Sequence, residues 1–178
     1  MRDPLGMFLL RWRIRAVLPH VQGNLLDIGC GTNDLVGTFR SYGGNGTGVD
    51  VYQWGTVDCV VENSASLPFN DGEFDTVTII GALNHIPNRE EVLKEANRVL
   101  ASNGKLILTM LSPHISKLWH KVRSQWDADQ KERGMKEGEL YGISRKDMHN
   151  LLDRTGFRVS YEHRFMFAIN RLTVASIV

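Results

Sequence analysis

Residues 25–34 read LLDIGCGTND and decide the fold of this chain. An apolar run, 25–28, carries one acidic residue, Asp27, and two glycines follow it, Gly29 and Gly31, before a segment that can begin a helix. Glycine lets the backbone approach a bound molecule closely and adopt dihedral angles that other residues avoid. The stretch therefore predicts a buried strand, a tight turn and a helix N-terminus beside a ligand.

Five short segments have the character of buried strands, because they are rich in Val, Ile and Leu and mostly lack strict alternation. They are residues 24–28, 46–51, 57–61, 74–80 and 105–110. Helical patterns alternate with them, the clearest over residues 88–101. This order predicts a Rossmann-like, doubly wound α/β sheet, mostly parallel with an antiparallel last strand and with helices on both faces. A ligand is expected beyond the carboxyl ends of the strands.

Two helices have a cap signal at the N-terminus. Asn88 with Glu91 is a candidate cap pair for the first, and Ser144 with Asp147 for the second. The second helix leads into a predicted strand over 157–161, so the alternation of strands and helices is expected to continue to the C-terminus.

Composition limits the possible functions. The 178 residues are 42% hydrophobic and 23% charged, which is typical of a soluble globular protein and not of a disordered chain. A net charge of +1 gives no overall field that attracts a polyanion, so there is no strong nucleic-acid signal. Cys30 and Cys59 lack zinc-site spacing, and the apolar run 7–10 is too short for a signal peptide or a membrane span. We expect a cytoplasmic protein with no metal.

The residues around the glycine turn decide between ligand classes. A dinucleotide site needs a third glycine where Asp34 stands, and carboxylates there would repel a pyrophosphate. A cationic ligand reverses this argument, because Asp27 can balance an ammonium or sulfonium group, while the helix N-terminus near Thr32 attracts a carboxylate. Asp50 ends the next strand, about twenty residues on, where a carboxylate can accept hydrogen bonds from both hydroxyls of a ribose.

With these residues the chain resembles the class I S-adenosylmethionine-dependent methyltransferases. The resemblance continues through residues 62–69 (ENSASLPF), Phe74-Asp75, His85 and Arg98-Val99-Leu100 before Gly104, and it covers residues 24–110. It implies that the first glycine turn holds the methionine end of the cofactor, that the ribose and adenine follow along the next two strand ends, and that the turn after 74–80 flanks the transferred methyl group. The cofactor-binding residues it implies are Asp27, Gly29, Cys30, Gly31, Asp50, Val51, Asn63, Ser64, Gly81 and Ala82.

The chain departs from the family pattern at two positions. The family's third glycine is Asn33, and the acid often found at the adenine contact is Asn63, which keeps a side-chain acceptor but loses the charge. Both leave open whether the cofactor binds more weakly.

His85 follows the strand 74–80 on the expected ligand side, and imidazole can accept a proton near neutral pH. We hypothesise that it is the catalytic base or orients the acceptor; packing at the turn before Pro87 is the alternative. Tyr141, Met166 and Asn170 are candidates for an acceptor pocket. His114 and His120 are six residues apart and do not share a helical face at metal-ligand spacing.

The arginines at 11, 13 and 15 alternate with Trp12 and Ile14, so they spread around a helix and do not form one face. We expect a solvated helix or an interface here.

One domain, residues 1–178, is expected. It divides into an N-terminal helix (1–23), a cofactor-binding half (24–110), an inserted helix and flap (111–142), and a C-terminal helix and strand pair (143–178). The predicted function is methyl transfer to a small-molecule or biosynthetic-intermediate acceptor by a monomer or homodimer. Two alternatives remain open: an RNA or protein methyltransferase, and a non-catalytic partner protein with this fold. GALN at 81–84 lacks the Asn/Asp-Pro-Pro-aromatic signature of nucleobase amino methylation.

Overall fold

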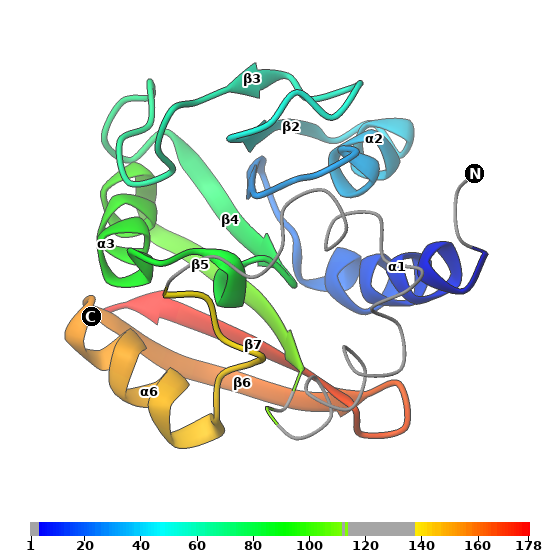
Figure 1. Cartoon of the computed structure of the whole chain (residues 1–178). Coiled ribbons are helices and arrows are strands. Elements are labelled where there is room, and N and C mark those ends of the chain that lie inside the picture. Colours follow the sequence, from blue (N-terminus) through cyan, green and yellow to red (C-terminus); the bar gives the residue numbers. More distant parts are fainter. Residues whose placement is uncertain (1–3, 112, 114–137) are drawn as a thin grey trace.

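A computed structural model describes residues 4–111, 113 and 138–178 (Figure 1). Its seven strands form one sheet in the order β3-β2-β1-β4-β5-β7-β6. The strands are β1 (Asn24–Ile28), β2 (Asn45–Asp50), β3 (Cys59–Val60), β4 (Phe74–Ile80), β5 (Leu100–Leu111), β6 (Phe157–Phe165) and β7 (Asn170–Ile177). The helices are α1 (Pro4–Val17), α2 (Asp34–Ser41), α3 (Arg89–Val99) and α6 (Arg145–Arg154), with 3-10 turns η1 (Leu18–His20) and η2 (Leu83–His85).

The first five strands are parallel, whereas β7 is antiparallel to both β5 and β6. This confirms the predicted fold class. The strand predicted at 57–61 is shorter than expected, and the one predicted at 105–110 is longer. β5 extends to Leu100 because that residue still pairs with Phe74 of β4.

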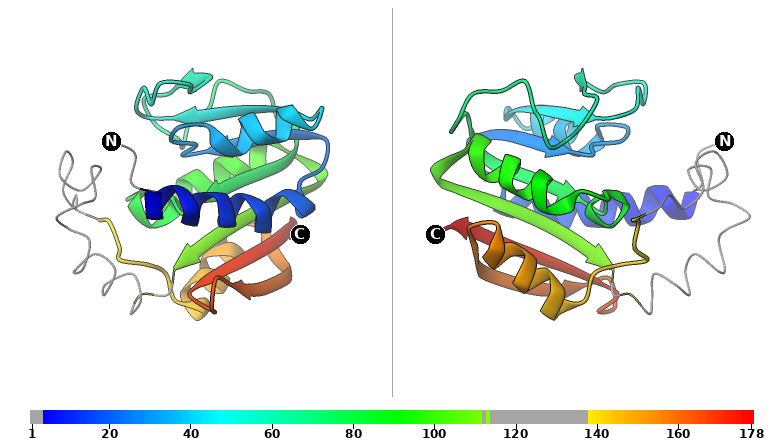
Figure 2. Two further views of the ribbon diagram at one scale, coloured as in Figure 1. Left: turned by 90° about the vertical axis from the view of Figure 1, so that its right-hand side faces the viewer. Right: turned by 60° about the vertical axis from the view of Figure 1, so that its left-hand side comes forward.

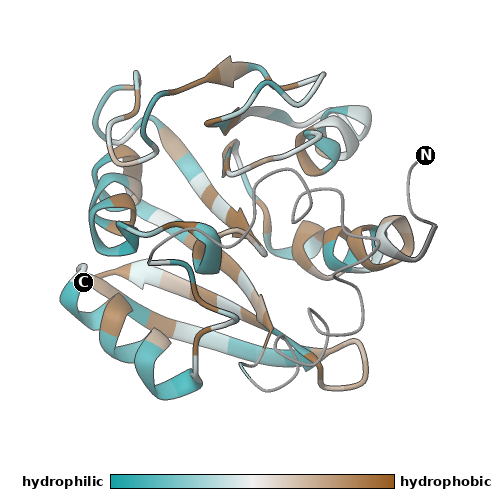
Figure 3. Cartoon of the chain, viewed as in Figure 1, coloured by the Kyte–Doolittle hydropathy of each residue, from teal (hydrophilic) through white to brown (hydrophobic). Residues whose placement is uncertain are grey.

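Helices cover both faces of the sheet (Figure 2). One core contains Val92 and Leu93 of α3 with Leu152 of α6, and the other contains Val17 of α1 with Val36 of α2. Neighbouring residues of one strand contribute to opposite cores because side chains alternate along a strand. Hydrophobic colour accordingly follows the strands, while the outer sides of α3 and α6 are largely hydrophilic (Figure 3).

The two predicted caps have different outcomes. Ser144 Oγ accepts a hydrogen bond from the Asp147 backbone N–H at 3.2 Å, which confirms the second cap. The cap pair of Asn88 with Glu91 was wrong, because Asn88 makes no side-chain cap bond. Its Nδ2 instead donates to Asn63 Oδ1 at 3.1 Å, so the residue links α3 to the loop after β3.

The expected inserted helix and flap, 111–142, falls mainly on residues 112 and 114–137, which lie outside the described residues, as do His114 and His120. The described helices include none that is long and apolar enough to cross a membrane. Among the described side chains, no group of three or more His, Cys, Asp or Glu residues is placed to hold a metal ion.

Candidate active site

A cavity of about 900 Å³ lies at the carboxyl ends of β1, β2 and β4, where a doubly wound sheet binds its ligands. The structure brings most of the expected residues together there. Eight of the ten expected cofactor-binding residues line it, and so does His85: Gly29, Gly31, Asp50, Val51, Asn63, Ser64, Gly81 and Ala82. Asp27 and Cys30 are not among the lining residues.

Gly29 joins the ends of three strands. Its N–H and that of Cys30 both donate to the Val49 carbonyl oxygen of β2, at 2.9 and 3.1 Å. Gly29 has a φ of +72°, and a Cβ at this position would lie 2.7 Å from Cβ of Ala82, which follows β4. Only glycine therefore allows the turn after β1 to approach the turn after β4 this closely.

Asp50 is fixed at the end of β2 by two backbone donors. Its Oδ2 accepts from the Gly31 N–H at 2.9 Å, and its Oδ1 accepts from the Tyr52 N–H at 3.1 Å. Each carboxylate oxygen retains a further lone pair. The side chain is therefore oriented while it can still accept hydrogen bonds from a diol in the cavity.

Asp27 is buried at the end of β1, with 3% of its surface exposed. Burial raises the pKa of this carboxyl from 3.8 to about 7; the hydrogen bond from Thr78 Oγ1 at 2.6 Å opposes the rise, and the charge of Asp50 adds to it. A cationic group nearby would favour the ionised form. Cys30 is half-buried, and burial raises the pKa of its thiol, which favours the neutral form.

Asn33, which replaces the family's third glycine, has a φ of +59° and adopts the left-handed conformation that glycine would take. Its side chain is buried and does not line the cavity: Nδ2 donates to the Thr56 carbonyl and to Asp58 Oδ2, both at 2.9 Å. Asp58 also pairs with Arg40 at 3.0 Å and accepts from the Gly48 N–H at 2.8 Å. Burial alone would raise the pKa of Asp58, but these hydrogen bonds outweigh it and lower the pKa.

Asn63 offers a ligand a different side-chain group from the one expected. Its Oδ1 accepts from the Ala65 N–H at 2.9 Å and from Asn88 Nδ2 at 3.1 Å. The side-chain oxygen of Asn63, which was expected to contact the adenine, therefore already accepts two hydrogen bonds within the protein. The amide group left for a ligand is Nδ2, a donor, which complements a ring nitrogen and not an exocyclic amine.

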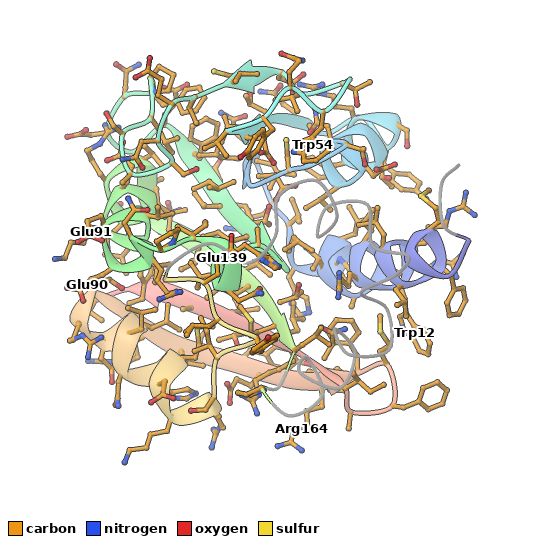
Figure 4. All side chains as sticks on the ribbon, viewed as in Figure 1. Trp12, Trp54, Glu90, Glu91, Glu139 and Arg164 are labelled. Atoms are coloured by element: carbon orange, nitrogen blue, oxygen red, sulfur yellow. The ribbon has the colours of Figure 1, made fainter. Side chains whose placement is uncertain are left out.

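His85 faces a carboxylate that the sequence analysis missed. Its Nδ1 lies 3.5 Å from Oε2 of Glu139, and both residues line the cavity. Figure 4 labels Glu139 on the segment that precedes α6, and Trp54, which lines the cavity from the loop between β2 and β3. No spacing or motif in the sequence links residues 85 and 139, since only the fold brings them together.

The three candidate acceptor residues do not line the cavity. Tyr141 is exposed, whereas Met166 and Asn170 are buried at the β6–β7 connection, with Asn170 Nδ2 3.2 Å from Met166 Sδ. The reason is the pairing of β7 with β5, which packs Phe165 and Met166 into the core beneath α1. Asn170 instead lines a separate cavity of about 270 Å³.

The remaining cavity residues were not among the expected site residues, although the helix N-terminus near Thr32 was expected to attract a carboxylate. They are Thr32, Tyr52, Trp54, Glu62, Ile80, Ile86, Pro87, Asn88 and Glu139. Most lie in loops after strand ends, where residue type alone does not indicate direction.

Residues 26–108 match the family model described as "Methyltransferase domain". The chain is 37% identical over 68 residues to the ubiquinone/menaquinone biosynthesis C-methyltransferase UbiE of Shewanella sp. (strain ANA-3), covering 38% of this chain and 27% of that protein. It is 33% identical over 98 residues to the sterol 4-C-methyltransferase strm-1 of Caenorhabditis elegans, covering 47% and 29%.

A similar fold occurs in a 1,6-didemethyltoxoflavin-N1-methyltransferase of Burkholderia thailandensis, solved with bound 1,6-didemethyltoxoflavin and S-adenosylhomocysteine. The TM-score is 0.68 at 16% identity, over 95% of this chain and 78% of that one. The match of residues 26–108 to a methyltransferase domain agrees with the resemblance to the class I S-adenosylmethionine-dependent methyltransferases that the sequence predicted. The chain spans less than a third of the length of the two curated relatives described above.

Proposed function

We propose that this chain transfers the methyl group of S-adenosylmethionine to a small-molecule acceptor. The observation that carries the proposal is the cavity at the strand ends, which is lined by glycine turns at its β1 and β4 ends and by the oriented carboxylate of Asp50 at its β2 end. Its volume of about 900 Å³ is at the large end of the roughly 300–1,000 Å³ usual for small-molecule sites, which leaves room for a compact acceptor beside the cofactor.

Each part of the cofactor has a proposed partner. Gly29 and Gly31 approach the methionine end, with Asp27 balancing its ammonium group, and Asp50 accepts from the ribose hydroxyls. The burial of Asp27 at the end of β1 supports this assignment, because a cation beside it would favour the ionised form that burial disfavours. Asn63 and Ser64 would hold the adenine.

When bound, the cofactor supplies an electrophilic methyl group on its sulfonium, so the protein has mainly to align the acceptor and exclude water. Gly81 and Ala82 flank the methyl group in this proposal. His85 removes a proton from an acceptor hydroxyl or ammonium, and Glu139 orients the imidazole.

The names of the relatives support a small acceptor, since they describe methyl transfer to quinone precursors, a sterol and a small heterocycle. A single domain over residues 1–178 remains a proposal, supported by the one continuous sheet. A cytoplasmic monomer or homodimer stays a prediction.

The test is methylation with S-adenosylmethionine carrying a radioactive methyl group. Phenols, quinols, amines and carbon acids are offered in parallel with total RNA and with protein extract. Label in a small product supports the proposal, and label only in RNA or protein refutes it.

The base assignment is tested with the acceptor so found. His85→Gln should lower kcat by about 100-fold or more, with little change in KM, because general-base catalysis contributes at least this much. His163→Gln, at an exposed position of β6, is the matched control. Glu139→Gln should give an intermediate loss, and near-normal kcat in His85→Gln would leave the histidine a packing role.

A further inference from the structure

Arg13 is a half-buried cation for which the described residues offer no counter-charge. It lies on α1, which is fixed against the sheet by its buried neighbours Ile14 and Val17. Its Nε is buried without a hydrogen-bond partner, and within the described part of the chain no ion pair includes it. Burial lowers the pKa of the guanidinium, with no carboxylate to oppose the effect. Arg11 and Arg15 of the same helix are exposed, whereas Arg13 is half-buried.

The guanidinium points to the proposed methyl-transfer end of the cavity. α1 lies beside the carboxyl end of β4 (Figure 1), and Gly81, directly after β4, lines the cavity. A Cβ added to Gly81 would lie 3.3 Å from Arg13 Nη1. Arg13 itself is not among the residues that line the cavity. Glycine at position 81 leaves the space beside its guanidinium free of a side chain.

A cation in this position costs stability unless an anion joins it, because a buried charge needs a partner. Arginine presents a planar fork of N–H donors that matches a carboxylate with two parallel hydrogen bonds. Asp27, two residues before the Gly29 turn, is a buried ionisable group, and no hydrogen bond or ion pair joins it to Arg13 in the described structure. An acid and a base, neither of them in an ion pair within the described structure, favour a ligand that carries both an ammonium and a carboxylate.

We propose that Arg13 binds a ligand carboxylate at the Gly81 end of the cavity. The inference rests on the proposed function, under which two molecules can supply the carboxylate: the methionine end of the cofactor or an acidic acceptor. The cofactor is favoured, because its methionine end carries both an ammonium and a carboxylate.

Calorimetry with two nucleosides tests the cofactor as the source. S-adenosylhomocysteine carries the carboxylate, and 5′-methylthioadenosine lacks the entire amino-acid portion. Arg13→Gln should bind S-adenosylhomocysteine about 10- to 100-fold more weakly, as expected for a lost charge-assisted hydrogen bond, with unchanged affinity for 5′-methylthioadenosine. Arg15→Gln, the same substitution at an exposed position of α1, should match the wild type with both ligands.

Thermal melting of the ligand-free proteins separates a ligand role from a structural one. Removing an unpaired, half-buried charge should leave the melting temperature of Arg13→Gln equal to or above that of the wild type. A lower melting temperature together with an equal loss of both nucleosides would mean that Arg13 maintains the fold, and would overturn the inference.

Benzoate, titrated into the free and the S-adenosylhomocysteine-loaded proteins, tests the acceptor as the source. Weaker benzoate binding by Arg13→Gln, with normal S-adenosylhomocysteine binding, would support a carboxylate site for the acceptor. Equal binding of every ligand by the variant and the wild type would overturn the inference. Failure of the wild type to bind either nucleoside would defeat the proposed function, and the benzoate titration of the free protein would still decide the role of Arg13.

Discussion

The substitution Asp27→Asn should make the free protein more stable at neutral and alkaline pH. Asparagine has the shape of a neutral carboxyl group and keeps an oxygen to accept the hydrogen bond from Thr78. What it removes is the ionisation of a buried acid. As the pH rises, Asp27 of the wild type becomes ionised, although burial and the charge of Asp50 both disfavour its ionised form.

The size of the effect follows from the pKa. One pKa unit corresponds to about 1.4 kcal/mol, so a rise from 3.8 to about 7 means that ionised Asp27 costs the folded state about 4 kcal/mol. Between these two values the folded protein holds a proton that the unfolded chain has lost. Stability therefore falls as the pH rises through this window, and the loss is complete above about pH 7.

Urea unfolding at pH 4, 5, 6, 7 and 8 measures this difference. The two proteins should be about equally stable near pH 4, and the variant should gain steadily until it is more stable by up to about 4 kcal/mol at pH 8. Asp153→Asn, at an exposed position of α6, is the control and should change stability by less than about 0.5 kcal/mol throughout. A constant difference between wild type and Asp27→Asn across this range would refute the reasoning.

Three further substitutions probe the site. Gly29→Ala combines a left-handed φ with a 2.7 Å approach to Ala82, so it should destabilise the protein by about 1–3 kcal/mol in urea unfolding; wild-type stability would contradict the close packing of the two turns. Asp50→Asn should weaken adenosine binding roughly 10-fold in calorimetry, since one oxygen becomes a donor, and unchanged affinity would exclude the ribose contact. Arg40→Gln removes a partly exposed ion pair, so it should cost under about 1 kcal/mol in the same unfolding assay; a larger loss would indicate that the pair is more important than its exposure suggests.

The sheet was predictable because its strands are buried on both faces. β1 and β4 begin and end at the residues predicted for them, 24–28 and 74–80, and the glycine turn after β1 places the ligand end of the sheet. β3 could not be delimited in the same way, because only Cys59 and Val60 find partners on β2. Pairing depends on the neighbouring strand, and the composition of one segment does not contain that information.

The site was predictable where a motif fixes the backbone and was missed where the fold alone brings residues together. Gly29, Gly31 and Asp50 belong to one local pattern of strand ends. Glu139 and Arg13 come from opposite ends of the chain, and their types and spacing are those of ordinary surface residues. Only the packing of α1 brings Arg13 beside Gly81, and only the course of the segment before α6 brings Glu139 beside His85.

Asn33 also limits how this sequence can vary. Glycine could adopt the left-handed backbone conformation of Asn33 without rearrangement. It would, however, lack Nδ2, which donates one of the hydrogen bonds that Asp58 accepts. A relative with glycine at position 33 leaves that carboxylate one donor short. The two positions should therefore co-vary among homologues, with an acid at 58 accompanying asparagine at 33 and a smaller or uncharged residue accompanying glycine.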